Sequence, residues 1–183
     1  MLTWLSKRSQ TKRKARDIYA AVVAQSRNPV FYESYGVADE PIGRYELIAL
    51  HLILALTRLG QPDVGDEELR RQTLETFVTD LDDAMREFGV GDPTVPKRVK
   101  RAAGGAHIRN DAYAAAMADA SDDALVGALT EYVYVNEPAP YAAALATYVR
   151  RAAAHLAALP ASTLAGGTIT FPSPEPNPSE HKP

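Results

Sequence analysis

The feature that most constrains the fold is a helix-length segment, residues 43–59, that is apolar on nearly every side. A helix of this kind is surrounded by other helices in a soluble core. Glu46 and His51 interrupt its apolar run, which is shorter than the roughly 20 residues that a membrane span requires. A turn rich in glycine and proline precedes the segment, and Gly60 is placed to cap its end in a left-handed conformation. We predict a buried central helix around which the rest of the chain packs.

Apolar residues at helical spacing predict further helices on both sides of the central one. They occur in residues 15–26, in 66–88 with Asp66 as the N-cap, after Pro93, after Ser121, and in a last segment that Pro160 closes. Gly104 and Gly105 each weaken the helix after Pro93, so a kink or break is predicted there. The predicted fold class is all-α, a single-domain bundle of about six helices around the buried central helix.

Length and composition set the domain boundaries that we expect. A chain of 183 residues fits one domain, which buries about 70% of the surface that its unfolded chain exposes. That domain is predicted to span residues 15–160, after a basic N-terminal segment at 1–14. Residues 161–183 contain repeated prolines and few large apolar side chains, so they are predicted to form a flexible, disordered tail. The absence of cysteine excludes disulfides and thiolate sites and fits a reducing compartment.

Charge is strongly sorted along the chain, although the net charge is only −3. Two basic clusters flank an acidic zone at residues 63–92. The clusters comprise Lys7, Arg8, Lys12, Arg13, Lys14 and Arg16, and then Lys97, Arg98, Lys100 and Arg101. Cations near the start of a helix are disfavoured by its dipole by roughly 0.3–1 kcal/mol each. Either the acidic helix compensates the second cluster, or an anionic partner, nucleic acid or phospholipid, does so.

The first residues combine apolar and basic side chains. Leu2, Trp4 and Leu5 precede the charges, whereas a secretory signal places its charges before a longer apolar core, so no export signal is evident. Trp4 either docks on the body from a frayed terminus or joins an interfacial anchor on anionic lipid. The anchor predicts membrane contacts by Trp4, Lys7, Arg8, Lys12, Arg13 and Lys14. The expected location is cytoplasmic, with peripheral contact on the inner face of the cytoplasmic membrane.

Signatures of catalysis and metal binding are scarce. The sequence contains no glycine-rich phosphate loop, no G-x-S-x-G elbow, and no H-E-x-x-H or E-x-x-H spacing. His51 lies in the predicted core, where a histidine is more often hydrogen-bonded structure than a ligand or base. Glu46 and His51 are about 140° apart around a helix, which disfavours an acid–base pair. We predict no enzyme activity and no cofactor, and the remaining enzyme alternative is a metal site at His51, Glu46 and the acidic helix.

Partner contacts are predicted on an aromatic link before the central helix and on the charged blocks. The aromatic rings either fill the core or line a groove. Arg44 and Glu46 are interpreted as buried or half-buried polar groups that fix the turn, with the mouth of a groove as the alternative. The predicted partner-binding residues are Phe31, Tyr32, Tyr35, Arg44, Asp80, Asp82, Arg86, Asp92, Lys97, Arg98, Lys100 and Arg101.

Two ordered blocks of residues carry a resemblance. The first contains Tyr35, Gly36, Val37, Asp39, Gly43, Arg44, Tyr45, Glu46, Leu47, Leu50, His51, Leu52, Arg58 and Leu59. The second contains Phe77, Asp80, Leu81, Asp82, Met85, Arg86, Glu87, Phe88, Gly89, Val90, Gly91, Asp92, Val95, Lys97, Val99 and Lys100. Together they resemble the ubiquinol-cytochrome c chaperone family over residues 17–159. Residues 104–107 depart from that family's bulkier, more aromatic continuation.

The resemblance implies a mostly helical, non-enzymatic assembly factor for cytochrome b of the respiratory bc1 complex. Mitochondrial members act with a small helper protein near the ribosomal exit and hold newly made cytochrome b. Because the similar region begins close to the N-terminus, leaving no room for a long presequence, a bacterial member is expected. The implied partners are cytochrome b or another bc1 subunit, a small helper protein and the ribosome, but no DNA. The alternative function is an RNA- or ribosome-associated protein that uses the basic clusters.

Overall fold

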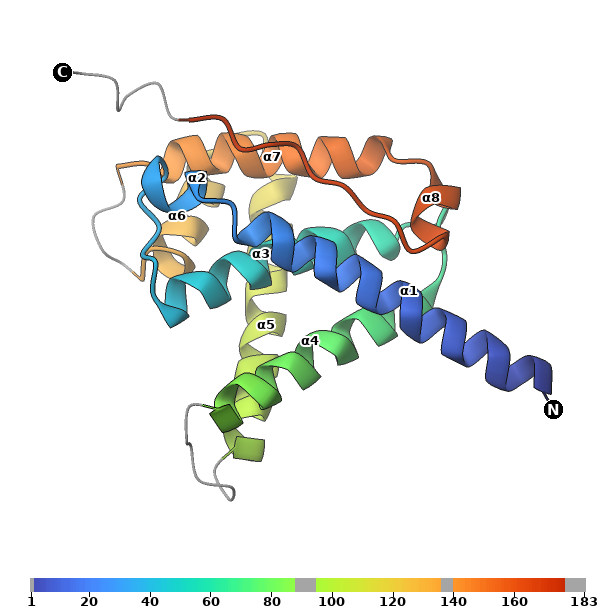
Figure 1. The fold of residues 1–183 in the computed structure, drawn as a ribbon. Helices are drawn as coiled ribbons and strands as arrows, with labels where there is room; N and C mark the ends of the chain where they lie inside the picture. The colour runs from blue at the N-terminus through green and yellow to red at the C-terminus, as the bar shows by residue number, and fades with distance from the viewer. Residues whose placement is uncertain (1, 88–94, 136–139, 177–183) are drawn as a thin grey trace.

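The computed structural model describes residues 2–87, 95–135 and 140–176, and all regular structure in these ranges is helical (Figure 1). The helices are α1 (Leu2–Ser26), α2 (Val30–Glu33), α3 (Pro41–Leu59), α4 (Glu67–Glu87), α5 (Val95–Ala118), α6 (Asp123–Tyr132), α7 (Ala142–Ala158) and α8 (Ala161–Ala165). The predicted all-α class is confirmed. The short helices α2 and α8 are additions to the six predicted ones.

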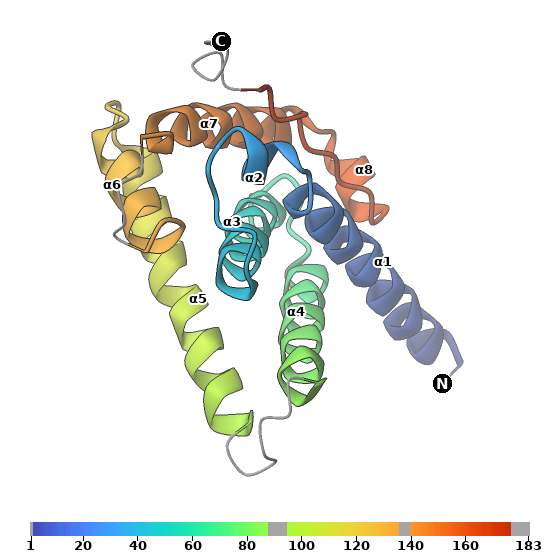
Figure 2. The ribbon, with the colours of Figure 1, turned by 60° about the vertical axis from the view of Figure 1, so that its left-hand side comes forward.

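Helix α3 is the central helix of the bundle. It packs against α1, α4, α5 and α7, and these helices surround it in Figure 2. Twelve of its 19 residues are buried. A Cβ at Gly43 would lie 2.1 Å from the carbonyl oxygen of Ala38, so only glycine lets the preceding turn close against the first turn of the helix. The prediction of a buried central helix is therefore confirmed. Gly60 follows its last residue as predicted, but its φ of −80° is right-handed rather than left-handed.

Helix α1 begins earlier than predicted, at Leu2 rather than near Ala15. Its buried stripe starts at Ala15 and continues through Ile18, Tyr19 and Val22. The earlier residues contain no glycine or proline and are rich in lysine, arginine and leucine, which are good helix formers. The helix that packs through Ala15 and the residues after it therefore continues towards the N-terminus over residues whose sequence has no apolar stripe. The boundary predicted between residues 14 and 15 lies inside this one helix.

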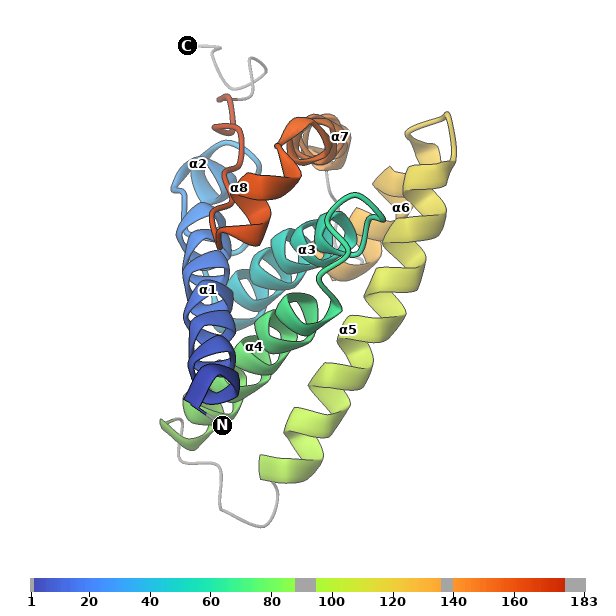
Figure 3. The ribbon, with the colours of Figure 1, turned by 90° about the vertical axis from the view of Figure 1, so that its right-hand side faces the viewer.

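Helices α4 and α5 both pack against α3 and against each other, and the chain passes from one to the other through residues 88–94, which lie outside the described ranges (Figure 3). The predicted N-cap of α4 is confirmed, because Asp66 Oδ1 accepts a hydrogen bond from the backbone N–H of Leu69 at 2.9 Å. The predicted break at Gly104 and Gly105 is wrong, since α5 is one helix from 95 to 118. Arg109 explains one glycine: its Nη1 lies 2.8 Å from the position that a Cβ on Gly105 would occupy.

The chain from residue 161 to residue 176 packs on the body, so this part of the predicted flexible tail is corrected, and the rest of the predicted tail lies outside the described residues. After α8, residues 166–176, here named the C-terminal strap, run in extended form along α1 and α7 (Figure 1). Leu164 is fully buried and Ile169 is 5% exposed. Lys14 Nζ donates to the carbonyl of Ala165 at 2.6 Å. The few apolar residues of this segment suffice because the buried ones pack against the core of the body.

None of the helices in the described ranges is long and apolar enough to cross a lipid bilayer.

Candidate functional site

His51, on the α3 face toward α1 and α7, is the centre of a buried polar network. Its Nδ1 lies 2.8 Å from the carbonyl oxygen of Leu47, so Nδ1 carries the proton and donates it there. Its Nε2 therefore accepts a hydrogen bond from the Tyr148 hydroxyl, at 2.8 Å. Gln25 Nε2 donates to that hydroxyl at 2.9 Å and also to the carbonyl of Pro172 in the strap. Burial lowers the pKa of His51 to about 4, so the imidazole is neutral at pH 7.

Aromatic rings enclose this imidazole. The rings of Phe31, Tyr148 and Phe171 lie 5.3, 5.7 and 5.3 Å from the His51 ring, centroid to centroid. Phe31 is fully buried and Tyr35 is 4% exposed. Of the two alternatives predicted for the aromatic link, a place in the core or in a groove, Phe31 and Tyr35 take the first. Their rings turn inward and fill the space between α1, α3 and α7.

Tyr32 and Arg44, two other predicted partner-binding residues, lie together at the surface. They line a hollow with Arg27, Glu33 and Asp39. Arg44 Nε donates to Asp39 Oδ1 at 2.7 Å, and the side chains of both residues are more than half exposed, at 57% and 59%. This hydrogen bond lowers the pKa of the Asp39 carboxyl below its ordinary value. Arg44 therefore holds the turn before α3 from outside and remains accessible.

Glu46 is satisfied by a residue that sequence reasoning missed. Its side chain is 3% exposed, and Arg109 on α5 donates to both carboxylate oxygens, from Nε at 2.7 Å and from Nη2 at 2.5 Å. The guanidinium carbon lies 5.6 Å from the Tyr45 ring centre and 5.0 Å from that of Tyr132. Burial raises the pKa of Glu46, while the bonds from Arg109 oppose that rise.

This pairing corrects the interpretation that Glu46 fixes the turn together with Arg44. One sequence signal pointed to Arg109: it is a lone cation at helical spacing from Tyr113 and Ala116, both of which are buried. A carboxylate predicted to be buried on the central helix requires such a cation.

An apolar groove lies between α3, α5 and α7. Its volume is about 310 Å³, and its walls include Ile53, Leu54, Tyr113, Met117 and Leu156. This surface, named here the α3/α5/α7 groove, was not predicted from the sequence, because its walls come from three helices far apart in the chain.

The mouth of the α3/α5/α7 groove is held by Arg58. Arg58 Nη1 and Nη2 pair with the carboxylate of Asp63 at 2.7 and 2.8 Å. Its Nε donates to the carbonyl of Leu156 at 2.9 Å and its Nη2 to that of Leu159 at 2.8 Å. One side chain thus fixes the C-terminal ends of α3 and α7 relative to each other.

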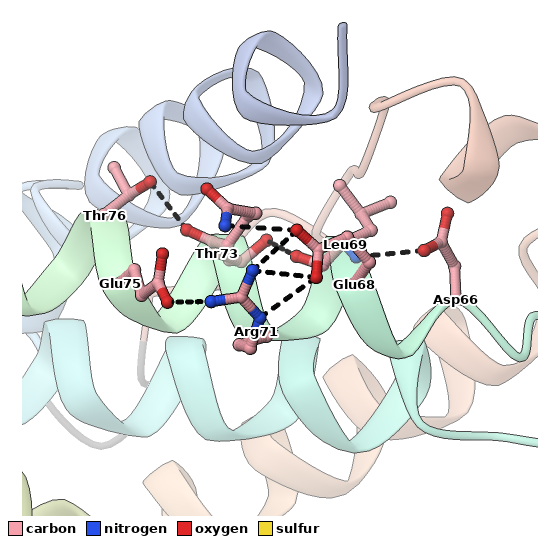
Figure 4. Close-up of polar contacts among 8 residues, drawn as sticks. Asp66, Glu68, Leu69, Arg71, Thr73, Glu75 and Thr76 are labelled. Carbon is pink, nitrogen blue, oxygen red and sulfur yellow. Dashed lines mark hydrogen bonds and ion pairs between the residues drawn. The ribbon is translucent and has the colours of Figure 1, made fainter. Parts of the chain in front are cut away.

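The acidic side chains of α4 meet cations of α4 itself and of α1. Figure 4 shows Arg71 bound to Glu68 and to Glu75 on the same helix. Asp80 accepts a hydrogen bond from the Tyr19 hydroxyl of α1 at 2.7 Å. Lys12 and Arg16 of α1 line a trough whose other wall contains Glu75, Asp80 and Asp83. Asp80, predicted to bind a partner, therefore has an internal one, while Asp82 is half-buried on the same helix.

The remaining predicted residues divide into three groups. Arg8, Lys12 and Arg13 are exposed, as membrane contact requires, whereas Lys14 is half-buried and bonded to α8. The residues of a second group lie on helices, but the structure does not describe their side chains: Trp4, Lys7, Arg86, Lys97, Arg98, Lys100 and Arg101. Asp92 lies outside the described residues altogether.

Neither His51 nor Glu46 is placed to bind a metal. Both imidazole nitrogens and both carboxylate oxygens already have protein partners. Within the described part of the chain, no three histidine or acidic side chains gather as a metal site requires.

Comparison with known proteins places this geometry in context. Residues 33–171 match the family described as ubiquinol-cytochrome C chaperone. The fold is similar to the crystal structure of the Cbp3 homolog from Brucella abortus, with 33% sequence identity, a TM-score of 0.84, and coverage of 94% of this chain and 97% of that chain. No curated protein matches the sequence. The matched family range includes α3, the α3/α5/α7 groove and the strap as far as Phe171.

Proposed function

Because this chain belongs to the ubiquinol-cytochrome c chaperone family, we propose that it is a non-enzymatic assembly chaperone for the respiratory bc1 complex. Its client is newly made cytochrome b, held at the inner face of the cytoplasmic membrane of a bacterium. The observation that carries this proposal is the α3/α5/α7 groove, a hollow with mostly apolar walls, next to a core in which the imidazole of His51 and the carboxylate of Glu46 have internal partners.

The size and lining of the groove suit side chains of a membrane segment. A volume of about 310 Å³ is at the lower end of the range for ligand pockets, so the groove accepts a few apolar side chains rather than a whole helix. Arg58 keeps the groove open by fixing α3 against α7. A client segment exposed before assembly would bury apolar surface here at about 25 cal/mol per Å².

The hollow around Tyr32 and Arg44 is the predicted partner surface that remains accessible near α3. We propose it as the contact for a small helper protein. Its mixed charges, from Arg27, Glu33, Asp39 and Arg44, suit a polar, reversible protein contact rather than a client's apolar segment.

Deletion of the gene tests the function. The expected result is a loss of cytochrome b and of bc1 activity, with the other respiratory complexes unchanged. Complementation with Met117→Glu, which places a charge in the groove wall, should fail. Ile108→Glu is the matched control, because Ile108 lies on the same helix, is 61% exposed and does not line the groove. Normal bc1 levels in the deletion strain would contradict the proposal, and equal failure of both variants would contradict the role of the groove.

A further inference from the structure

The N-terminal half of α1 is a basic helix that leaves the packed body. The first buried side chain that the structure describes on α1 is Ala15, and Figure 1 shows the helix continuing well past the strap toward its N-terminus. Arg8, Lys12, Arg13 and Arg16 are exposed. Residues 1–16 contain no acidic side chain. Arg13 lies about 160° from Ala15 around the helix, on the side away from the core.

The second basic cluster lies at the same end of the molecule. Figures 1–3 are turned about one vertical axis, and in all three the N-terminal ends of α1 and α5 are low, with the end of α4 between or beside them. Residues 97–101 belong to the first turns of α5. Two clusters about eighty residues apart in the sequence thus form two corners of one face. We name this face the basic end and define it by residues 2–16, 80–87 and 95–101.

The basic end has a charge opposite to that of the rest of the chain. It contains eleven lysine and arginine residues against four acidic ones, whereas the remaining sequence contains nine against nineteen. Asp80, one of the four, is hydrogen-bonded to Tyr19. Lys12 and Arg16 line a trough with Glu75, Asp80 and Asp83, which offset part of the charge of α1, whereas Arg13 does not line that trough. A molecule with separated charge is oriented by an oppositely charged surface as well as attracted by it.

We propose that the basic end docks on a bilayer that contains anionic phospholipid. Lipid fits better than nucleic acid because Leu2, Trp4 and Leu5 occupy the first turns of α1 beside the cations. Tryptophan and leucine next to lysine and arginine are typical of segments that lie at the headgroup level. The cations of α1, the cations of α5 and the apolar residues in the first turns of α1 then hold the body in one orientation on the membrane. This docking is independent of which client the chaperone holds.

Vesicle sedimentation tests the docking with the full chain. Binding to phosphatidylcholine vesicles with about a third phosphatidylglycerol is expected at low salt, with a steep loss as salt rises and no binding to phosphatidylcholine alone. Neutralising a docking cation should weaken partitioning about fivefold, which corresponds to about 1 kcal/mol per charge. Arg13→Gln and the pair Lys97→Gln and Lys100→Gln probe the two corners. Arg27→Gln is the matched control, an exposed arginine just after the opposite end of α1, and should bind as wild type.

Trp4 supplies a second readout, because it is the single tryptophan of the chain. Its fluorescence should shift to the blue when anionic vesicles are added and not when neutral vesicles are added. Absence of binding to anionic vesicles at low salt overturns the proposal, as does an equal loss for Arg13→Gln and Arg27→Gln. RNA binding at physiological salt by a protein that ignores vesicles would assign the basic end to nucleic acid instead. The assay contains no cytochrome b, so its failure leaves the chaperone proposal standing.

Discussion

His51 and Glu46 lie on the same helix and are both buried, yet they are satisfied in opposite ways. His51 is neutral, and its network joins α3 to α1, α7 and the strap through hydrogen bonds. Glu46 is paired with a single cation on α5. A neutral network distributes its stabilisation over several bonds, whereas an ion pair depends on both partners being present. The side of α3 toward α5 should therefore be the more sensitive to one substitution, and the side toward α7 the more sensitive to pH.

Arg109→Leu should have the largest effect. It leaves the Glu46 carboxyl buried without a partner, which costs about 3–5 kcal/mol of unfolding free energy. Denaturant unfolding measures this. The double variant Glu46→Leu with Arg109→Leu should recover most of the loss, because no unpaired charge remains. A double variant no more stable than the single one would show that the loss comes from packing around Tyr45 and Tyr132 instead.

Acid should destabilise the protein through His51. The folded-state pKa of about 4 lies below the unfolded value of 6.5, so the unfolded chain binds more protons between these values. Stability is full above pH 6.5 and falls as pH drops toward 4, by at most about 3 kcal/mol. Burial raises the pKa of Glu46, which acts in the opposite direction. The comparison of wild type with His51→Gln between pH 7 and 4 isolates the histidine, and parallel curves would contradict its role.

Tyr148→Phe should cost less, about 1–3 kcal/mol, because it leaves His51 Nε2 buried without a donor. The substitution also removes the acceptor for Gln25. Tyr32→Phe is the control: that hydroxyl donates to Ser26 at 2.9 Å from a half-buried ring, where water can replace it. Thermal unfolding of the two variants, compared with wild type, gives the difference. Equal losses of stability in the two variants would mean that the hydrogen bonds around His51 stabilise the protein no more than the hydrogen bond of Tyr32 does.

The smallest effect should come from Asp39→Asn. This substitution breaks the pair with Arg44, but both side chains are largely exposed, so solvent replaces the interaction. No measurable change in the unfolding midpoint is expected at physiological salt. A clear loss of stability would mean that the exposed pair in the turn before α3 contributes as much as the buried groups His51 and Glu46. It would weaken the contrast drawn between those two sites.

The predictable parts of this structure are those that local sequence determines. The apolar residues around α3 and the Asp66 cap follow from spacing and side-chain chemistry within a few residues. Glu46 and Arg109 are 63 residues apart in the sequence, and no local pattern predicts which cation pairs with the carboxylate. The aromatic link shows what the sequence does not determine. The size of Phe31 and Tyr35 indicated either a place in the core or a place in a groove, and only the packing of α1, α3 and α7 decides that they face inward.

The same distinction separates the candidate surfaces. Tyr32 and Arg44 were predicted, and the structure brings them together. The α3/α5/α7 groove was missed because Ile53, Met117 and Leu156 each have ordinary core spacing in their own helix. That these side chains line one hollow is decided by the angle between helices, which depends on side chains along the whole length of each contact.

During synthesis, the core around His51 stays open until the C-terminal strap has left the ribosome. Gln25 can form its hydrogen bond to the carbonyl of Pro172 only after a further 147 residues have been made, and Lys14 can form its bond to the carbonyl of Ala165 only after a further 151. Helix α1 is thus made before the other described helices and is among the last to be fully covered, and contacts of such long sequence separation slow folding. The network around His51 is therefore complete only after the strap has been made.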